Sequence, residues 1–218
     1  MSCPICNLRK EKRFCLARHE RICAQCCGEQ RELTLDCPSE CPYLQQARQH
    51  EKPKEPSTGP SQDLFPGVEI SEDFLLRHEP LLTGIMQTLG RISVANRSLR
   101  DRDLTGAIEN MVRSYQTLIA SGLVYQESLP NPVQQEIIGV LHELLREFRE
   151  VETRYQGYTS LKDADILKAL VFSLRLMQLH TSGRPLSRAF IDFLHEKFPA
   201  PATPLGPAAE TGSRIIIP

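Results

Sequence analysis

The sequence predicts a mainly α-helical protein that begins with a small, cysteine-rich ββα module. All eight cysteines of the 218-residue chain lie between Cys3 and Cys41. Apolar residues between 71 and 198 recur at spacings of three and four, the pattern of helices that bury one face. No long run in that region alternates with a period of two, as a half-buried strand would. We therefore expect the module to be followed by a bundle of four to five helices.

The composition divides the chain into four segments. We expect the module over 1–50, a flexible linker over 51–70, a helical bundle over 71–198 and a disordered tail over 199–218. Prolines concentrate in the linker and the tail, at Pro53, Pro56, Pro60, Pro66, Pro199, Pro201, Pro204, Pro207 and Pro218. Neither segment has an apolar period, so neither can bury enough surface to offset the entropy lost on ordering.

Three cysteine pairs organise the module. They are Cys3/Cys6 and Cys23/Cys26, each with two intervening residues, and Cys37/Cys41, with three. Pairs of the first kind fit a tight turn that aims two thiolates at one metal ion. Residues four apart lie on one face of a helix, and Pro38 and Ser39 can open that helix. The alternating residues 31–35 predict a short strand before it.

The number of donors predicts two structural zinc ions, since each tetrahedral zinc takes four ligands. The first set is Cys3, Cys6, Cys23 and Cys26. The second set is Cys15, Cys37 and Cys41, completed by either Cys27 or His19. We favour Cys27 because a free thiol beside a zinc site would be reactive. The two sets interleave along the chain, so the module is predicted to be a cross-brace.

This spacing resembles the MYND and HIT-type zinc fingers, whose Cys-x2-Cys pairs end in a His-x3-Cys on a helix. Here Cys37 replaces that histidine. The phrases Cys-Pro-Ile-Cys, Ile-Cys-Ala-Gln-Cys-Cys-Gly and Asp-Cys-Pro-Ser-Glu-Cys-Pro-Tyr-Leu are also similar to an uncharacterised group of bacterial zinc-ribbon-like proteins with helical C-terminal parts. The resemblance covers residues 3–41 and implies a fold context without a function.

Other uses of the cysteines fit less well. Disulfide frameworks belong to secreted chains, and this chain shows no export signal at its start. Iron-sulfur clusters take three or four cysteines from a compact run, which would leave half of these without a role. Four cysteines around each zinc leave no open position for a catalytic water, so the metal is expected to hold the fold.

Helix signals in the bundle region predict an up-and-down arrangement. Ser71 is expected to cap the first helix, which Pro80 should break near Glu79. The later helices are expected over about 101–121, 132–156, 160–182 and 185–198, with Gly122, Gly157 and Gly183 at three of the ends. The run 166–179 is apolar on nearly every side, which predicts a central, buried helix.

No catalytic pattern accompanies this bundle, so we expect a protein that is not an enzyme. The nearest approach to the Glu-x-x-His pairs of a two-metal bundle is Asp192 with His195, which occurs once. There is no glycine-rich phosphate loop and no Gly-x-Ser-x-Gly motif. The formal net charge of −1 excludes a polybasic or acidic tail. We therefore expect a protein partner rather than a small-molecule substrate.

Two alternatives stay open. A basic edge in the module suggests nucleic-acid binding; it comprises Arg9, Lys10, Lys12, Arg13, Arg18 and Arg21. The same edge can instead screen the charge of the thiolates, and the module offers only Phe14 and Tyr43 for stacking on bases. The second alternative is a thiol redox sensor that releases zinc when Cys26 and Cys27 are oxidised.

The predicted location is the cytoplasm, with no membrane partner. The first residues lack the basic and apolar regions of a signal peptide, and no stretch of 18 or more apolar residues occurs.

Overall fold

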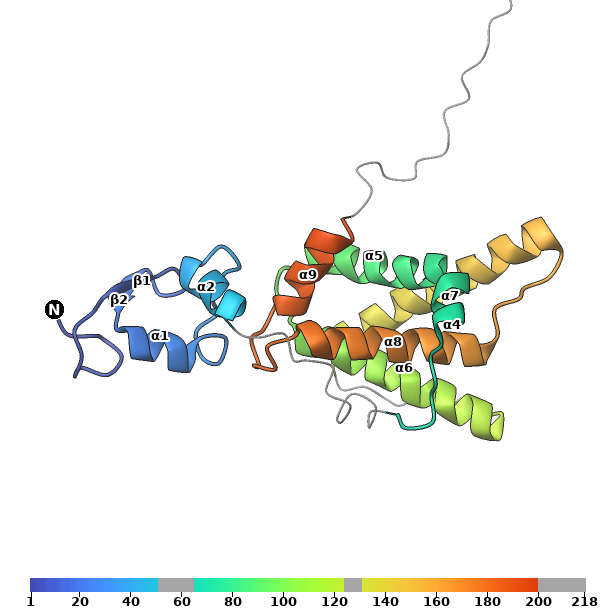
Figure 1. The fold of residues 1–218 in the computed structure, drawn as a ribbon, viewed down its shortest axis with the longest axis horizontal. Helices are drawn as coiled ribbons and strands as arrows, with labels where there is room; N and C mark the ends of the chain where they lie inside the picture. Colours follow the sequence, from blue (N-terminus) through green and yellow to red (C-terminus); the bar gives the residue numbers. More distant parts are fainter. Residues whose placement is uncertain (51–64, 124–130, 200–218) are drawn as a thin grey trace, which may run out of the picture.

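A computed structural model describes residues 1–50, 65–123 and 131–199. A small N-terminal module lies at one end of a helical bundle, with the N-terminus on the side away from the bundle (Figure 1). The described part of the chain is mainly helical, as predicted, and contains one two-stranded antiparallel sheet in the module. Residues 51–64 of the predicted linker and 200–218 of the predicted tail lie outside the described residues.

The module contains one β-hairpin and two short helices. Strand β1 (Arg13–Cys15) pairs with β2 (Glu20–Ile22), and the helices are α1 (Ala24–Gln30) and α2 (Pro42–His50). Phe14 and Arg21 pair in the middle of the hairpin and are exposed. Cys15 and Ile22 point the other way, into a small core that also contains Leu35 and Leu44. The period of two along each strand thus separates a solvent face from a cysteine-lined face.

The prediction of a strand over residues 31–35 is wrong, because these residues form a tight turn. The backbone N–H groups of Leu33 and Leu35 both donate to the carbonyl of Gln30. Glu32 has a positive φ of 53°, and its carboxylate is buried against Arg48 at 2.8 Å. Glu32 and Leu35 are buried whereas Leu33 is half exposed, so burial does not follow the alternation that predicted a strand.

The helices of the bundle begin and end close to the predicted residues. Its helices are α4 (Glu72–Arg77), α5 (Glu79–Ala95), α6 (Asp101–Ser121), α7 (Pro132–Gln156), α8 (Asp163–His180) and α9 (Ala189–Lys197). The Ser71 hydroxyl accepts from the Phe74 amide. The break between α4 and α5 falls at His78, and Pro80 lies in the first turn of α5. Gly122 and Gly157 end α6 and α7 in the left-handed backbone conformation. Glycine adopts this conformation without the steric cost that a side chain would bring.

Packing among the four long helices differs from the predicted up-and-down order. The extensive contacts join α5 with α7 and α8, and join α6 with the same two helices. This gives the ring order α5, α7, α6, α8, so α5 and α6 lie across the ring from each other although they are consecutive in the chain. Helix α8 is buried along most of its length, as predicted, and α9 closes one end against α5 and α8. Apolar stripes predict which face is buried but not which helix covers it.

The chain contacts the bundle before residue 71. Phe65, Val68 and Ile70 pack partly against the helical core, and the Arg175 guanidinium donates to the Val68 carbonyl at 3.0 Å. These residues fall within the range predicted as linker, so the packed region extends to Phe65. None of the helices in the described ranges is long and apolar enough to cross a membrane.

Candidate metal centre

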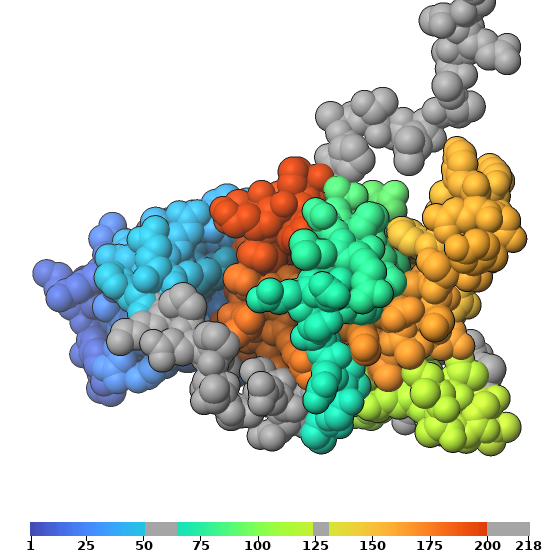
Figure 2. Space-filling model, turned by 45° about the vertical axis from the view of Figure 1, so that its right-hand side comes forward, coloured from blue at the N-terminus to red at the C-terminus, as the bar shows by residue number. Residues whose placement is uncertain are grey.

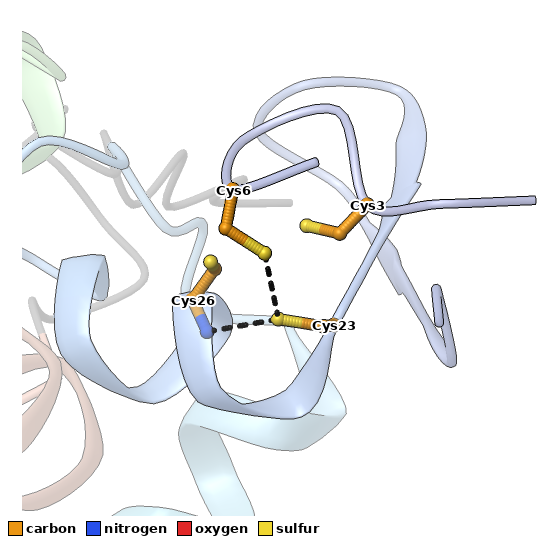
Figure 3. A group of neighbouring side chains, drawn as sticks. All are labelled: Cys3, Cys6, Cys23 and Cys26. Atoms are coloured by element: carbon orange, nitrogen blue, oxygen red, sulfur yellow. Dashed lines mark hydrogen bonds between the residues drawn. The ribbon is translucent and has the colours of Figure 1, made fainter. Parts of the chain in front are cut away.

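Four cysteine sulfurs converge at the outer end of the module. The Sγ atoms of Cys3, Cys6, Cys23 and Cys26 all lie within 4.8 Å of one another, and Cys6 Sγ is 4.0 Å from Cys23 Sγ. Figure 3 shows the four side chains pointing toward one another from two segments of chain. Three of them are at most 3% exposed, and Cys6 is partly exposed. The first predicted donor set is thus brought together.

Backbone amides position the first pair. The chain turns sharply after Cys3, where the Asn7 amide donates to the Cys3 carbonyl at 2.8 Å and Asn7 adopts a positive φ of 53°. Hydrogen bonds from the backbone N–H groups of Leu8 and Arg9 lower the pKa of Cys6 to about 6. Hydrogen bonds to a charged form favour that form, so this turn stabilises a thiolate.

The second pair belongs to the start of α1. Cys23 is the N-cap residue of this helix, and its Sγ accepts from the Cys26 amide at 3.3 Å. Cys26 lies in the first turn of α1, one helical turn from Cys23. A cysteine here takes the place of the usual Ser, Thr, Asp or Asn cap. The helix start therefore holds both sulfurs on the side facing Cys3 and Cys6.

The four thiols cannot all ionise without a compensating cation. Burial, followed by hydrogen bonding with Cys23, Cys6 and Cys3, raises the pKa of Cys26 to about 12. Partial desolvation opposes the change at Arg9, but its hydrogen bond to Cys6 and attraction to the sulfurs raise the pKa of that guanidinium. A metal ion supplies a much larger local positive charge than one arginine. These four cysteines can hold one metal ion.

The second predicted donor set is buried in the same module but is less compact. Cys15, Cys27, Cys37 and Cys41 are each 6–8% exposed. Burial raises the pKa of Cys37 to about 11, and the charges of Cys41, Cys15 and Cys27 act in the same direction. Within the described residues, the first set is the one group of His, Cys, Asp and Glu side chains whose ligand atoms all lie within 4.8 Å. The two-ion cross-brace is therefore not confirmed.

The two candidates for the last donor lie in different surroundings. Cys27 is buried on α1, where the Arg13 guanidinium donates to its Sγ at 3.6 Å. His19 is exposed in the turn between β1 and β2, with a positive φ of 54°.

Arginines of the basic edge are engaged within the module. Arg13 lies 4.7 Å from the ring centroid of Tyr43, in addition to its contact with Cys27. Arg18 forms an ion pair with Glu20, and the Arg21 guanidinium donates to the Lys12 carbonyl at 3.2 Å. The side chains of Lys10 and Lys12 are exposed. Arg9 interacts with the thiol of Cys6, and Arg13 with the thiol of Cys27, so both arginines are engaged by cysteines of the module.

Among the described bundle residues, Ser93 and His195 come closest to a nucleophile and base. Ser93 Oγ lies 2.8 Å from His195 Nε2, and the same hydroxyl donates to the Gly90 carbonyl at 2.7 Å. Ser93 is 1% exposed. The Ser93 proton is therefore used within its own helix, and the contact with His195 joins α5 to α9. Asp192, which the sequence places near His195, instead accepts hydrogen bonds from Ser39 and Arg48 of the module.

Comparison with models of known protein families, with curated proteins and with solved structures found no match to this chain.

Proposed function

We propose that this protein is a non-enzymatic zinc-binding protein that acts through contacts with another protein. The observation that carries the proposal is the convergence of four cysteine sulfurs, with no other donor type among them. Sulfur is a soft ligand, and a four-sulfur site favours zinc in its structural role. Such a closed site has no open position for substrate or water, which supports a role in holding the module's fold.

A second zinc ion belongs to the proposal. Cys15, Cys27, Cys37 and Cys41 share one small core, and this supports the second ion because four sulfurs are the number that a tetrahedral zinc site takes. The charges of Cys41, Cys15 and Cys27 act with burial to raise the pKa of Cys37, which supports grouping these four cysteines. A bound cation would lower the pKa of these thiols and draw the sulfurs together. The full set then accounts for every cysteine in the chain.

A protein partner is favoured over nucleic acid by what the basic edge contacts. Arg9, Arg13 and Arg18 interact with Cys6, Cys27 and Glu20. Their charge is thus partly used inside the module, which weakens the phosphate-binding alternative. The redox alternative requires Cys26 and Cys27 to be oxidised, and both thiols are at most 7% exposed.

The test compares partners captured by the zinc-loaded chain and by a Cys3→Ser/Cys6→Ser double variant, with and without nuclease. We expect the intact chain to retain a nuclease-resistant partner that the double variant loses. Zinc content measured on the same samples shows whether the variant has lost metal. Lys10→Glu/Lys12→Glu serves as the matched variant, because both lysines are exposed and neither is a ligand.

Capture that disappears with nuclease, falls steeply with salt and is lost in Lys10→Glu/Lys12→Glu would establish the nucleic-acid alternative instead. Partners that bind the Cys3→Ser/Cys6→Ser variant and the intact chain equally would contradict a role for the zinc module in binding.

A further inference from the structure

A network of charged groups joins the module to the bundle. The Arg48 guanidinium of α2 donates to Glu32 in its own module at 2.8 Å and to Asp192 of α9 at 2.6 Å. The Ser39 hydroxyl donates to the other oxygen of Asp192 at 2.7 Å. Glu32 is 2% exposed. One partly buried arginine therefore ties the turn after α1 to the last helix of the bundle.

Bundle residues also bind the module. The Arg184 guanidinium donates to the carbonyls of Gly28, at 3.1 Å, and Arg31. The Leu186 amide donates to the Glu32 carbonyl at 2.9 Å. Arg100, which precedes α6, donates to the Asp36 carboxylate at 2.6 Å. Figure 2 shows the module lying against the end of the bundle that α8 and α9 form. We call this set the junction; its charged side chains are Glu32, Asp36, Arg48, Arg100, Arg184 and Asp192.

The junction is polar, whereas each side of it has its own apolar core. The buried apolar cluster of the module comes from residues 3–44, and that of the bundle from residues 65–198. A cavity of about 530 Å³ lies at the seam, between Pro38 and Ser39 of the module and Val94, Arg97 and Arg188 of the bundle. Polar, incompletely packed contacts are typical of domain interfaces that can open. If the junction opens, its charged side chains can form hydrogen bonds with water in place of the contacts that they lose.

The module's half of the junction is built on the cysteine-bearing segment. Gly28 lies two residues after Cys26 on α1, and the turn that carries Glu32 and Asp36 runs between Cys27 and Cys37. Helix α1 has seven residues, and a helix that short does not persist in water without outside support. Small modules with little apolar core depend on metal for their fold. Without metal, the carbonyls of Gly28 and Glu32 lose their fixed positions.

We propose that the junction is a metal-dependent intramolecular contact. With zinc bound, α1 and the following turn hold Arg184 and Leu186, and the module covers the α8–α9 end of the bundle. When zinc leaves, the module loses its fold and detaches, while the bundle keeps its own core and exposes Arg100, Arg184 and Asp192. This inference rests on the proposed zinc site, and it adds that the site's occupancy determines whether this face of the bundle is covered.

The experiment measures amide hydrogen exchange in the full chain, zinc-loaded and after chelation. We expect chelation to speed exchange of the Leu186 amide at least roughly tenfold, the effect of losing one hydrogen bond and its shielding. The Asp101 amide is the internal control, because it donates to Ser187 within the bundle at 2.9 Å. Its exchange is expected to stay slow.

Arg184→Gln and Arg48→Gln test the contact without touching a ligand. Each is expected to speed exchange at Leu186 while zinc content stays unchanged, and Arg77→Gln, an exposed arginine on α4, is expected to change neither. Protection of Leu186 that survives complete removal of zinc would overturn the proposal while leaving the zinc site intact. Full unfolding of the bundle on chelation would also overturn it. A purified chain with no bound metal would instead overturn the proposed function itself, and this inference with it.

Discussion

Sulfur positions in the module are set by backbone amides as much as by the cysteines themselves. Cys6 receives hydrogen bonds from the amides of Leu8 and Arg9, and Cys23 receives one from Cys26. The spacing within the pairs Cys3/Cys6 and Cys23/Cys26 was sufficient to predict that the four sulfurs converge, because a two-residue gap fits a tight turn. The ion pair between Glu32 and Arg48 could not be predicted, because a single pair of charged residues leaves no periodic signal in the sequence.

The choice between Cys27 and His19 as the last donor of the second set can be tested with single substitutions. Cys27→Ala is expected to reduce bound zinc from about two ions per chain to about one, because Cys27 lies in the buried cysteine cluster. His19→Ala is the matched control and is expected to retain both ions, since His19 is exposed in the hairpin turn. Metal analysis of both purified variants checks the assignment. Loss of zinc from the histidine variant alone would assign the place to His19.

Contacts between the ends of α6 and α9 depend on one carboxylate. Asp101, 3% exposed in the first turn of α6, accepts from the Ser187 hydroxyl at 2.6 Å and the Thr181 hydroxyl at 3.0 Å. It also accepts from the amides of Phe190 and Ile191, both at 3.2 Å, in the first turn of α9. Burial raises the pKa of Asp101, and these four hydrogen bonds act against that rise. One side chain thus caps a helix from another part of the chain.

Asp101→Ala is expected to lower the free energy of unfolding by about 2 to 4 kcal/mol, because it leaves several buried donors without an acceptor. Asp101→Asn keeps the shape and part of the accepting capacity, so its loss is expected to be smaller. Urea denaturation of the zinc-loaded chain, followed by circular dichroism, measures both. An alanine variant as stable as the parent would show that these hydrogen bonds contribute nothing net.

Helix boundaries were the most predictable part of the bundle. Ser71, Asn131, Gly122 and Gly157 lie where capping chemistry places them, at the starts and ends of helices. The ring order of the helices was not predictable from the same pattern. Helix α8 is apolar on nearly every side, so it can accept neighbours in several arrangements. Packing geometry across distant residues, rather than any local signal, selects α5 and α6 as its partners.

At the scale of the whole molecule, two separate cores meet at one polar junction. The sequence predicted both parts, since the cysteines and the helical periodicity occupy different ranges. It predicted a flexible connection between them, and the direct contacts of Arg48, Arg100 and Arg184 were not foreseen. The hydrogen bonds of these arginines join positions up to 156 residues apart in the sequence. Arginines near the ends of helices are usually exposed to solvent, so the sequence alone gives no sign of these contacts.

The central claim is that Cys3, Cys6, Cys23 and Cys26 hold a structural zinc ion. The most direct test is zinc X-ray absorption on a Cys37→Ser/Cys41→Ser variant, which removes two donors of the second set. The predicted result is one zinc per chain surrounded by four sulfurs at about 2.3 Å. A site with oxygen or nitrogen ligands in place of sulfur, or a chain that holds no zinc, would contradict it.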